Sequence, residues 1–229
     1  MDTGVAAVLF DVDGTLVDSN DAHATAWIKA FNEFGIAVDP VLVRRCIGMG
    51  GDKLMPRVSG LQEESTVGAQ IARRRGEIFR TQLLPGLKPF PGAEQLVEAT
   101  VARGFRAVAA SSASKKDLLP LLEIAGAKSL LDDWTSSDDA DESKPSPDIV
   151  DAALARAKVP ASAAVLIGDT PYDIAAGRSA GVRVIAFRCG GWLDPDLVGA
   201  IEIYAGPWEL VQKLDRSLLS GLRDVGSEH

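Results

Sequence analysis

Four short polar segments of the sequence carry side chains that could do chemistry together. Each directly follows an apolar run or directly precedes a helix-like pattern, and they are 11–15, 111–112, 144–145 and 168–173. In an open parallel sheet, ligands bind at the carboxyl ends of the strands. We therefore expect the four segments to converge at one edge of such a sheet. The carboxylates brought together there are those of Asp11, Asp13, Asp169 and Asp173.

These carboxylates need a compensating positive charge, because two like charges ~4 Å apart repel by about 4 kcal/mol at an effective dielectric of 20. Oxygen ligands in a chain with only two histidines favour a hard cation, and Mg²⁺ is the natural candidate. Lys144 supplies a second, fixed positive charge. Ser111 and the backbone amides after it can donate hydrogen bonds to anionic oxygens. The set matches a phosphoryl group held between metal, lysine and donors.

The surrounding sequence predicts the elements that position these residues. Short continuous apolar runs are typical of strands buried on both faces, and they occur at Val5–Phe10, Phe105–Ala110, Ala163–Ile167 and Val182–Phe187. Helix-patterned sequence separates the later runs, at Ala93–Arg103, Asp117–Ala125 and Pro147–Lys158. Strands that alternate with helices in this way predict an α/β fold with a parallel sheet flanked by helices.

Residues 17–88 interrupt this alternation. They contain helix-like patterns, with Trp27 and Phe31 on one helical face, but no buried-strand run. A Pro/Gly-rich connector at 84–92 closes the segment. We therefore expect an all-helical cap domain at 17–88, inserted into a core domain formed by 1–16 and 89–229.

Composition limits the partners and compartments to be considered. A formal net charge of −8 repels a polyanionic backbone, and the one dense basic run, Arg73–Arg75, is interpreted as a solvated helix face, so no nucleic acid partner is expected. No segment approaches the ~20 apolar residues of a membrane span. The two cysteines lie far apart and suggest no disulfide framework. We expect a cytoplasmic protein, while the oligomeric state stays open.

With these motifs in place, the sequence resembles the haloacid dehalogenase (HAD) superfamily. Within it, the chain is similar to the phosphoglycolate phosphatase and β-phosphoglucomutase-like branch, whose helical cap follows the first strand. The strongest motif is Asp-x-Asp-Gly-Thr-Leu-Val-Asp-Ser at 11–19, supported by Ser111, Ser143–Asp148 and Gly168–Asp173. The resemblance covers nearly the whole chain and implies a Rossmann-like core with a helical cap.

The resemblance also implies an activity and two catalytic residues. Asp11 would be the nucleophile that forms an aspartyl-phosphate, and Asp13 the general acid and base. The implied reaction is Mg²⁺-dependent hydrolysis of a small phosphomonoester, of the phosphoglycolate or sugar phosphate type. Dehalogenation is disfavoured, because dehalogenases lack the second aspartate.

Further site residues follow from the same resemblance. The implied metal ligands are Asp11, the main-chain carbonyl of Asp13, and Asp169, with Asp173 behind them. The groups implied to hold the phosphoryl oxygens are Ser111, the amide of Ser112, and Lys144.

Two alternative functions are weighed against hydrolysis. A β-phosphoglucomutase-like phosphomutase uses the same aspartyl-phosphate, and basic cap residues hold its non-transferring phosphate, a role for which Arg75 is the candidate. The cap loop Ile47–Asp52, however, carries glycines where that enzyme has a phosphate-binding arginine. The second alternative is a catalytically silent phosphate-binding regulator. Such a protein would be expected to have lost one of the catalytic side chains present here.

Two cap residues, His23 and Trp27, fall where β-phosphoglucomutase also has a histidine and a tryptophan. For His23, two interpretations stay open: packing or capping near the start of a cap helix, or a role in substrate binding or as a hinge. Trp27 shares a helical face with Phe31 and Phe34, so we expect it to pack in the core of the cap.

Overall fold

A six-stranded parallel sheet forms the centre of the computed structural model, which describes residues 5–220. Its strand order is β3-β2-β1-β4-β5-β6. The strands are β1 (Ala7–Phe10), β2 (Arg106–Ala110), β3 (Asp133–Thr135), β4 (Ala164–Gly168), β5 (Arg183–Phe187) and β6 (Glu202–Tyr204). The first strand of the chain therefore lies in the middle of the sheet, between β2 and β4.

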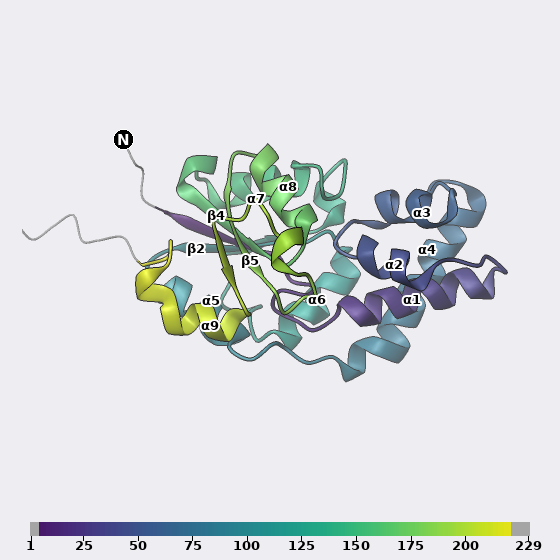
Figure 1. Cartoon of the computed structure of the whole chain (residues 1–229), viewed down its shortest axis with the longest axis horizontal. Coiled ribbons are helices and arrows are strands. Elements are labelled where there is room, and N and C mark those ends of the chain that lie inside the picture. Colours follow the sequence, from purple (N-terminus) through teal and green to yellow (C-terminus); the bar gives the residue numbers. More distant parts are fainter. Residues whose placement is uncertain (1–4, 221–229) are drawn as a thin grey trace, which may run out of the picture.

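The α-helices of the described residues form two groups, which Figure 1 shows at the sheet and beyond one end of it. The cap helices are α1 (Asn20–Glu33), α2 (Pro40–Cys46), α3 (Gly51–Ser59) and α4 (Thr66–Ile78). The core helices are α5 (Ala93–Ala102), α6 (Lys115–Ile124), α7 (Asp148–Ala157), α8 (Pro171–Ser179) and α9 (Pro207–Lys213). The predicted α/β fold with an inserted helical cap is confirmed.

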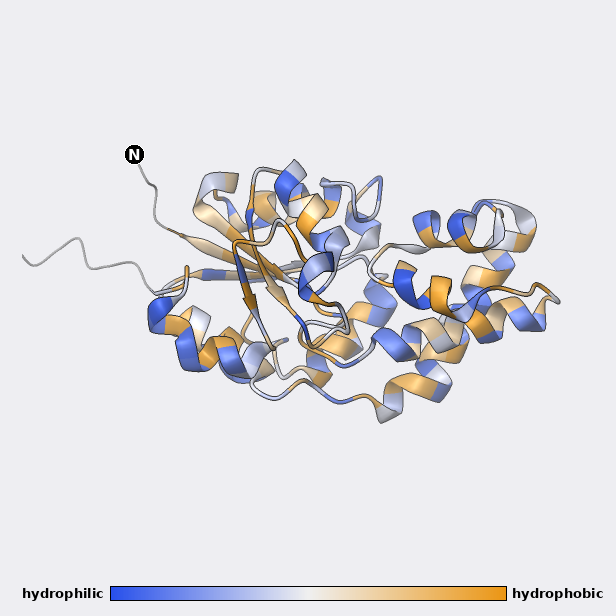
Figure 2. Ribbon diagram, in the orientation of Figure 1, coloured by the Kyte–Doolittle hydropathy of each residue, from blue (hydrophilic) through white to orange (hydrophobic). Residues whose placement is uncertain are grey.

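Both faces of the sheet are covered, as the apolar character of its strands requires. Successive side chains of a strand point to opposite faces. In β1, Val8 and Phe10 accordingly belong to one hydrophobic cluster and Ala7 and Leu9 to the other. Figure 1 shows α7 and α8 over one face and α5 and α9 over the other, and Figure 2 shows the strands as the most apolar part of the core.

Strand register brings the polar segments of the sequence together. Phe10, the last residue of β1, pairs with Ala109 of β2 and Ile167 of β4. The residues that follow these strands, including Asp11, Ser111 and Asp169, therefore emerge at the same edge. The cap helices lie beyond this edge in Figure 1.

The apolar packing of the cap is continuous with that on one face of the sheet, and two adjacent chain segments join the cap to the core. Trp27 is buried, and its ring lies 5.7 Å from that of Phe31, which confirms the predicted packing role, whereas Phe34 is 37% exposed. The amide of Asp18 donates to the carbonyl of Lys88, and the amide of Phe90 donates to that of Leu16. These bonds tie the two linkers together. The exact limits of the two domains stay a prediction.

Some elements differ from the expectation. The two outer strands, β3 and β6, were not predicted, because each has only three residues and carries an acidic side chain. The sequence Ser146-Pro147-Asp148 is typical of a helix start with a serine cap, but the hydroxyl of Ser146 donates to the carboxylate of Asp148 and does not cap α7. Within residues 5–220, every helix is too short or too polar to cross a membrane.

Candidate active site

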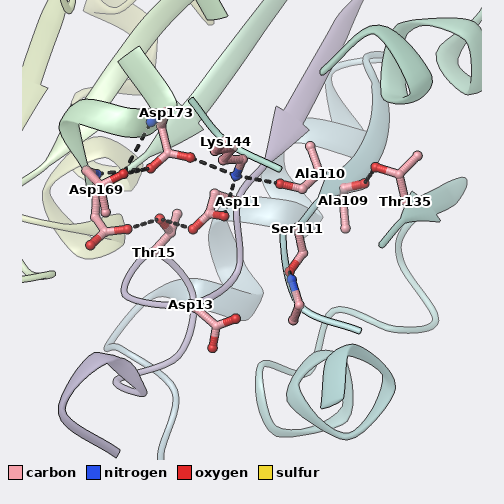
Figure 3. Close-up of polar contacts among 12 residues, drawn as sticks. Asp11, Asp13, Thr15, Ala109, Ala110, Ser111, Thr135, Lys144, Asp169 and Asp173 are labelled. Carbon is pink, nitrogen blue, oxygen red and sulfur yellow. Dashed lines mark hydrogen bonds and ion pairs between the residues drawn. The ribbon is translucent and has the colours of Figure 1, made fainter. Parts of the chain in front are cut away.

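Asp11 and Lys144 form a buried ion pair at the carboxyl end of β1. Lys144 is 1% exposed, and its Nζ lies 2.6 Å from Asp11 Oδ1 and 2.7 Å from Asp173 Oδ1. It also donates to the carbonyl of Ala110, at 2.8 Å, so three oxygens surround the ammonium (Figure 3). Burial works to lower the pKa of Lys144, but the two carboxylates outweigh it and hold the pKa above its ordinary value. Lys144 is therefore a fixed cation.

Asp169 follows β4 and is completely buried. Asn20 Nδ2 donates to its Oδ2 at 2.8 Å, and Thr15 Oγ1 lies 3.2 Å from its Oδ1 and 3.0 Å from Asp11 Oδ2. Two glycines make room for this carboxylate, because a Cβ on Gly14 or Gly190 would lie 2.4 or 1.7 Å from Oδ2. Gly14 also has a φ of 77°, a conformation that favours glycine.

The two carboxylate oxygens of Asp173 have different partners: one accepts hydrogen bonds at the start of α8, and the other faces Lys144. Asp173 is the third residue of α8, and its Oδ2 accepts hydrogen bonds from the backbone amide and the hydroxyl of Thr170, at 3.0 and 2.6 Å. The Thr170 hydroxyl in turn accepts from the amide of Asp173, which completes a capping box. Its other oxygen is the one that faces Lys144.

Together these side chains form an acidic cluster, which we define as Asp11, Asp169 and Asp173. One oxygen from each lies within 4.8 Å of the others, and all three residues are buried. Burial raises the pKa of Asp11 to about 7, against the pull of Lys144. Burial and the neighbouring Asp11 and Asp173 carboxylates raise the pKa of Asp169 well above its usual range. Three carboxylates facing one ammonium leave negative charge uncompensated, and this oxygen donor set fits a hard divalent cation.

Asp13 lies outside this cluster, and in Figure 3 its carboxylate points away from it. Its Oδ1 accepts from the Ser19 hydroxyl at 2.5 Å and lies 2.6 Å from His23 Nε2. Burial works to raise the pKa of Asp13, but the contacts with His23 and Ser19 prevail and hold it below its ordinary value. Among the described residues, Oδ2 has no hydrogen-bond partner, so this oxygen is available to a ligand.

The two serines after β2 have different surroundings. Ser111 is buried, and its hydroxyl accepts from the amide of Ala113 at 3.0 Å. Ser112 lines a cavity between the core edge and the cap, and its hydroxyl is buried without a partner in the part of the chain that the structure describes. An anionic oxygen of a ligand would satisfy that hydroxyl.

A cavity of about 460 Å³ separates the core edge from the cap, and Asp11 and Asp13 both line it. The cap is held against the core on the sides of this cavity. The amide of Gly50 donates to Ser143 Oγ at 3.0 Å, and Arg44 donates to the carbonyl of Gly190 at 2.7 Å. The structure therefore represents a closed arrangement, in which the cavity is large enough for a small molecule.

His23 and Arg75 extend the site into the cap. His23 is 4% exposed and stacks on Phe79 with ring centroids 4.0 Å apart. Its Nδ1 lies 2.6 Å from Nη2 of Arg75, and Arg75 also lines the cavity. Arg75 is 17% exposed, so the interpretation of the whole Arg73–Arg75 run as a solvated face is wrong for this residue. Arg73, two residues earlier on α4, is 71% exposed.

A family model for haloacid dehalogenase-like hydrolases matches residues 8–187, which span β1 to β5. The chain belongs to the haloacid dehalogenase-like hydrolase family. Over 208 residues it is 30% identical to a phosphoglycolate phosphatase of Rhodospirillum rubrum, with 86% of each chain covered. Over 188 residues it is 26% identical to the fructose-1-phosphate phosphatase YqaB of Escherichia coli, with 80% of this chain and 96% of that one covered.

The fold of the HAD family is equally clear in solved structures. A hydrolase from Pseudomonas syringae has a TM-score of 0.84 at 25% identity, with 92% of this chain and 98% of that chain covered. The predicted branch, with a helical cap after the first strand, is confirmed. The chain is an HAD-like phosphatase.

Sequence reasoning missed several residues of this HAD site. Thr15 lies inside the motif at 11–19 and Asn20 directly follows it, and this position after β1 is the signal that could have identified them as hydrogen-bond partners of Asp169. Asp117 contacts Arg75 and Arg80 from α6. No local pattern marks it, since an acidic residue in the first turn of a helix is ordinary.

Proposed function

We propose that the chain is a Mg²⁺-dependent phosphatase that hydrolyses a small phosphomonoester through an aspartyl-phosphate on Asp11. The observation that carries this proposal is the arrangement around Asp11. Its carboxylate is buried against Lys144 and two further carboxylates, at a cavity that Asp13 also lines. An isolated buried carboxylate would become protonated, whereas this one has a fixed cation and a place for a second one.

The proposed Mg²⁺ ligands are Asp11, the main-chain carbonyl of Asp13, and Asp169. Asp173 lies close enough to complete the cluster, although Lys144 and Thr170 already engage its two oxygens. When bound, the metal would neutralise charge on the phosphoryl oxygens and reduce their repulsion with Asp11. Lys144 and the Ser111–Ser112 segment would hold the remaining oxygens, and the unpartnered hydroxyl of Ser112 supports this role.

Two displacements at phosphorus account for the reaction. In the first, a carboxylate oxygen of Asp11 bonds to phosphorus, the ester P–O bond breaks, and the leaving alkoxide takes a proton from Asp13. In the second, Asp13 takes a proton from water while the water oxygen bonds to phosphorus. The bond to Asp11 then breaks, which releases inorganic phosphate and restores both aspartates.

The surroundings of Asp13 suit this double role. Contacts of Oδ1 with His23 and Ser19 fix the side chain and favour its carboxylate form, which the second displacement requires. A phosphate dianion next to Oδ2 favours the protonated form, which the first displacement requires. Substrate binding and product formation would therefore shift the proton in the required direction.

Relatives that act on phosphoglycolate and on fructose 1-phosphate support a small phosphomonoester as the substrate. The test is phosphate release from a panel of such esters, including phosphoglycolate and hexose phosphates, with Mg²⁺ and with EDTA. We expect release that depends on Mg²⁺ and disappears in Asp11→Asn. Equal release with EDTA, or wild-type turnover of the variant, would contradict the proposal. Conversion of β-glucose 1-phosphate to glucose 6-phosphate after priming with a bisphosphate, without phosphate release, would establish a phosphomutase instead.

A further inference from the structure

Asp117 is a buried carboxylate of the core that binds two arginines of the cap. It lies in the first turn of α6 and is 1% exposed. Nη1 of Arg75 lies 2.8 Å from Asp117 Oδ2, and Nη1 of Arg80 lies 2.7 Å from Asp117 Oδ1. Each oxygen therefore has its own guanidinium, and the three side chains connect α6 with the end of the cap.

The local backbone is shaped to bring Arg80 to this carboxylate. The chain changes from α-helix to a π-helical turn at Phe79–Leu83, directly after α4. Such turns are rare and occur frequently at functional sites. Gly76 leaves space for the Arg80 guanidinium, because a Cβ at position 76 would lie 2.9 Å from one of its nitrogens. The two arginines therefore approach Asp117 side by side, although they come from different turns.

Hydrogen-bond chemistry gives this network a direction. Arginine only donates, so His23 Nδ1, 2.6 Å from Arg75, accepts and carries no proton. A neutral His23 then carries its proton on Nε2, which lies 2.6 Å from Asp13 Oδ1 and donates to it. Asp117 fixes Arg75, Arg75 selects the tautomer of His23, and His23 fixes Asp13. The aromatic rings of Trp27 and Phe79, 5.5 and 5.4 Å from the guanidinium, leave Arg75 little freedom to turn.

We propose that Asp117 is a positioning residue for Asp13. It acts through Arg75 and His23 and touches neither the substrate nor the reacting atoms. The proposal rests on the function proposed above, in which Asp13 transfers the proton in both displacements. It also assigns a role to α6. This helix follows the Ser111–Ser112 segment, which is proposed to hold the phosphoryl group, and its Asp117 would orient the proton-transfer group in the closed arrangement.

A purely structural role for Asp117 predicts a different kinetic result. If it only held the cap closed, its loss would mainly raise KM. If it positions Asp13, its loss lowers kcat. The charge change sharpens this contrast, because Asp117→Asn removes a negative charge from the cavity wall and leaves both guanidinium groups. A phosphate dianion is then attracted more strongly, so KM stays constant or falls.

The kinetic experiment compares four variants with the wild type on the best alkyl phosphomonoester of the panel. We expect Asp117→Asn to lower kcat about tenfold or more without raising KM. Arg75→Gln should lower kcat too, and the double variant Asp117→Asn/Arg75→Gln should stay within about twofold of Arg75→Gln alone, because both changes break the same chain. Glu123→Gln is the matched control, since Glu123 is an exposed carboxylate on α6 whose one ion-pair partner within residues 5–220 is Lys128. A rise in KM with unchanged kcat, or multiplying effects in the double variant, would overturn the proposal.

A spectroscopic measurement tests the same geometry without turnover. The chain has two histidines, His23 and His229, so side-chain ¹⁵N NMR of the full-length protein is readily assigned with a His229→Gln variant. We expect a proton on Nε2 of His23 in the wild type, and a changed Nδ1 and Nε2 pattern in Asp117→Asn. An unchanged His23 spectrum refutes the positioning role. If the spectrum changes as expected but the wild type releases no phosphate from any ester, the proposed function fails and the positioning of His23 by Asp117 stands.

Discussion

The two sides of the cavity differ in how fully their carboxylates are paired with positive groups. On the core side, the acidic cluster places three carboxylates against one ammonium, that of Lys144. On the side that faces the cap, the core carboxylate of Asp117 lies between two arginines of the cap, and Asp13 has a histidine and a hydroxyl on one oxygen. The core side therefore lacks positive charge, whereas the cap side is already satisfied.

This difference indicates that the core side is suited to bind a cation, whereas the other side is already held in one geometry by its paired charges. Uncompensated carboxylates are costly when buried, and a cation that binds them recovers that cost. Paired charges with short, directed contacts hold each other in one orientation instead. We therefore expect the core side to respond to metal and pH, and the cap side to respond to changes in geometry.

The largest expected effect comes from Asp11, the proposed nucleophile. Asp11→Asn preserves the size of the side chain but removes the charged oxygen that would attack phosphorus, so we expect turnover to fall by about 10⁴-fold or more. Steady-state phosphate release measures this, and circular dichroism checks that the fold is intact. Residual turnover close to that of the wild type would move the nucleophile elsewhere.

The next effect tests the other aspartate. Asp13→Asn removes the proton-transfer group, and we expect kcat to fall by about 10²- to 10⁴-fold. An alkyl ester needs a proton on its leaving oxygen, whereas p-nitrophenolate leaves readily without one. The loss in kcat/KM should therefore be larger for the alkyl ester than for p-nitrophenyl phosphate. Equal losses for the two substrates would remove Asp13 from the first displacement.

A smaller effect on stability sharpens the contrast in charge. Asp169 has a raised pKa in the folded protein, so the metal-free protein loses stability as the pH rises from the ordinary value of 3.8 through the raised one. Asp169→Asn abolishes this loss, and we expect it to increase the free energy of unfolding of the metal-free protein at pH 8. The gain should vanish near pH 4.

Urea denaturation in EDTA at the two pH values measures this effect. Added Mg²⁺ should stabilise the wild type at pH 8 and leave Asp169→Asn unchanged. A variant less stable than the wild type at pH 8 without metal would show that the acidic cluster is not electrostatically strained.

The smallest effect concerns a cap–core contact that belongs to neither charged group. The hydroxyl of Tyr172 donates to the carbonyl of Arg45 at 2.6 Å. A neutral hydrogen bond contributes about 1 kcal/mol, so Tyr172→Phe should raise KM about fivefold at most and leave kcat unchanged. A fall in kcat comparable to that of Asp117→Asn would mean that any loosening of the cap disturbs Asp13, and the difference between the two regions would disappear.

The convergence of the core-side residues could be predicted from the sequence, whereas the pairing of Arg75 with Asp117 could not. Buried strands are recognisable in the sequence as apolar runs. The topology of a parallel sheet then brings Asp11, Ser111 and Asp169 to one edge. Arg75 and Asp117, in contrast, meet only because α4 and α6 approach each other after folding, and 42 residues separate them in the chain. Neither residue has a local pattern that specifies its partner. Side-chain pairing between separately folded elements is fixed by tertiary packing, which composition and periodicity do not encode.

The paired linkers between core and cap have a consequence for the modularity of this protein. Val17 and Pro89 form an antiparallel bridge, so the chain leaves the core and returns to it at nearly the same point, with Cα atoms about 5 Å apart. A segment whose two ends coincide can be exchanged without moving the strands that it interrupts. Grafting a relative's cap between positions 17 and 89 would therefore transplant substrate selection onto an unchanged phosphoryl-transfer apparatus, provided that the graft also supplies an arginine for Asp117.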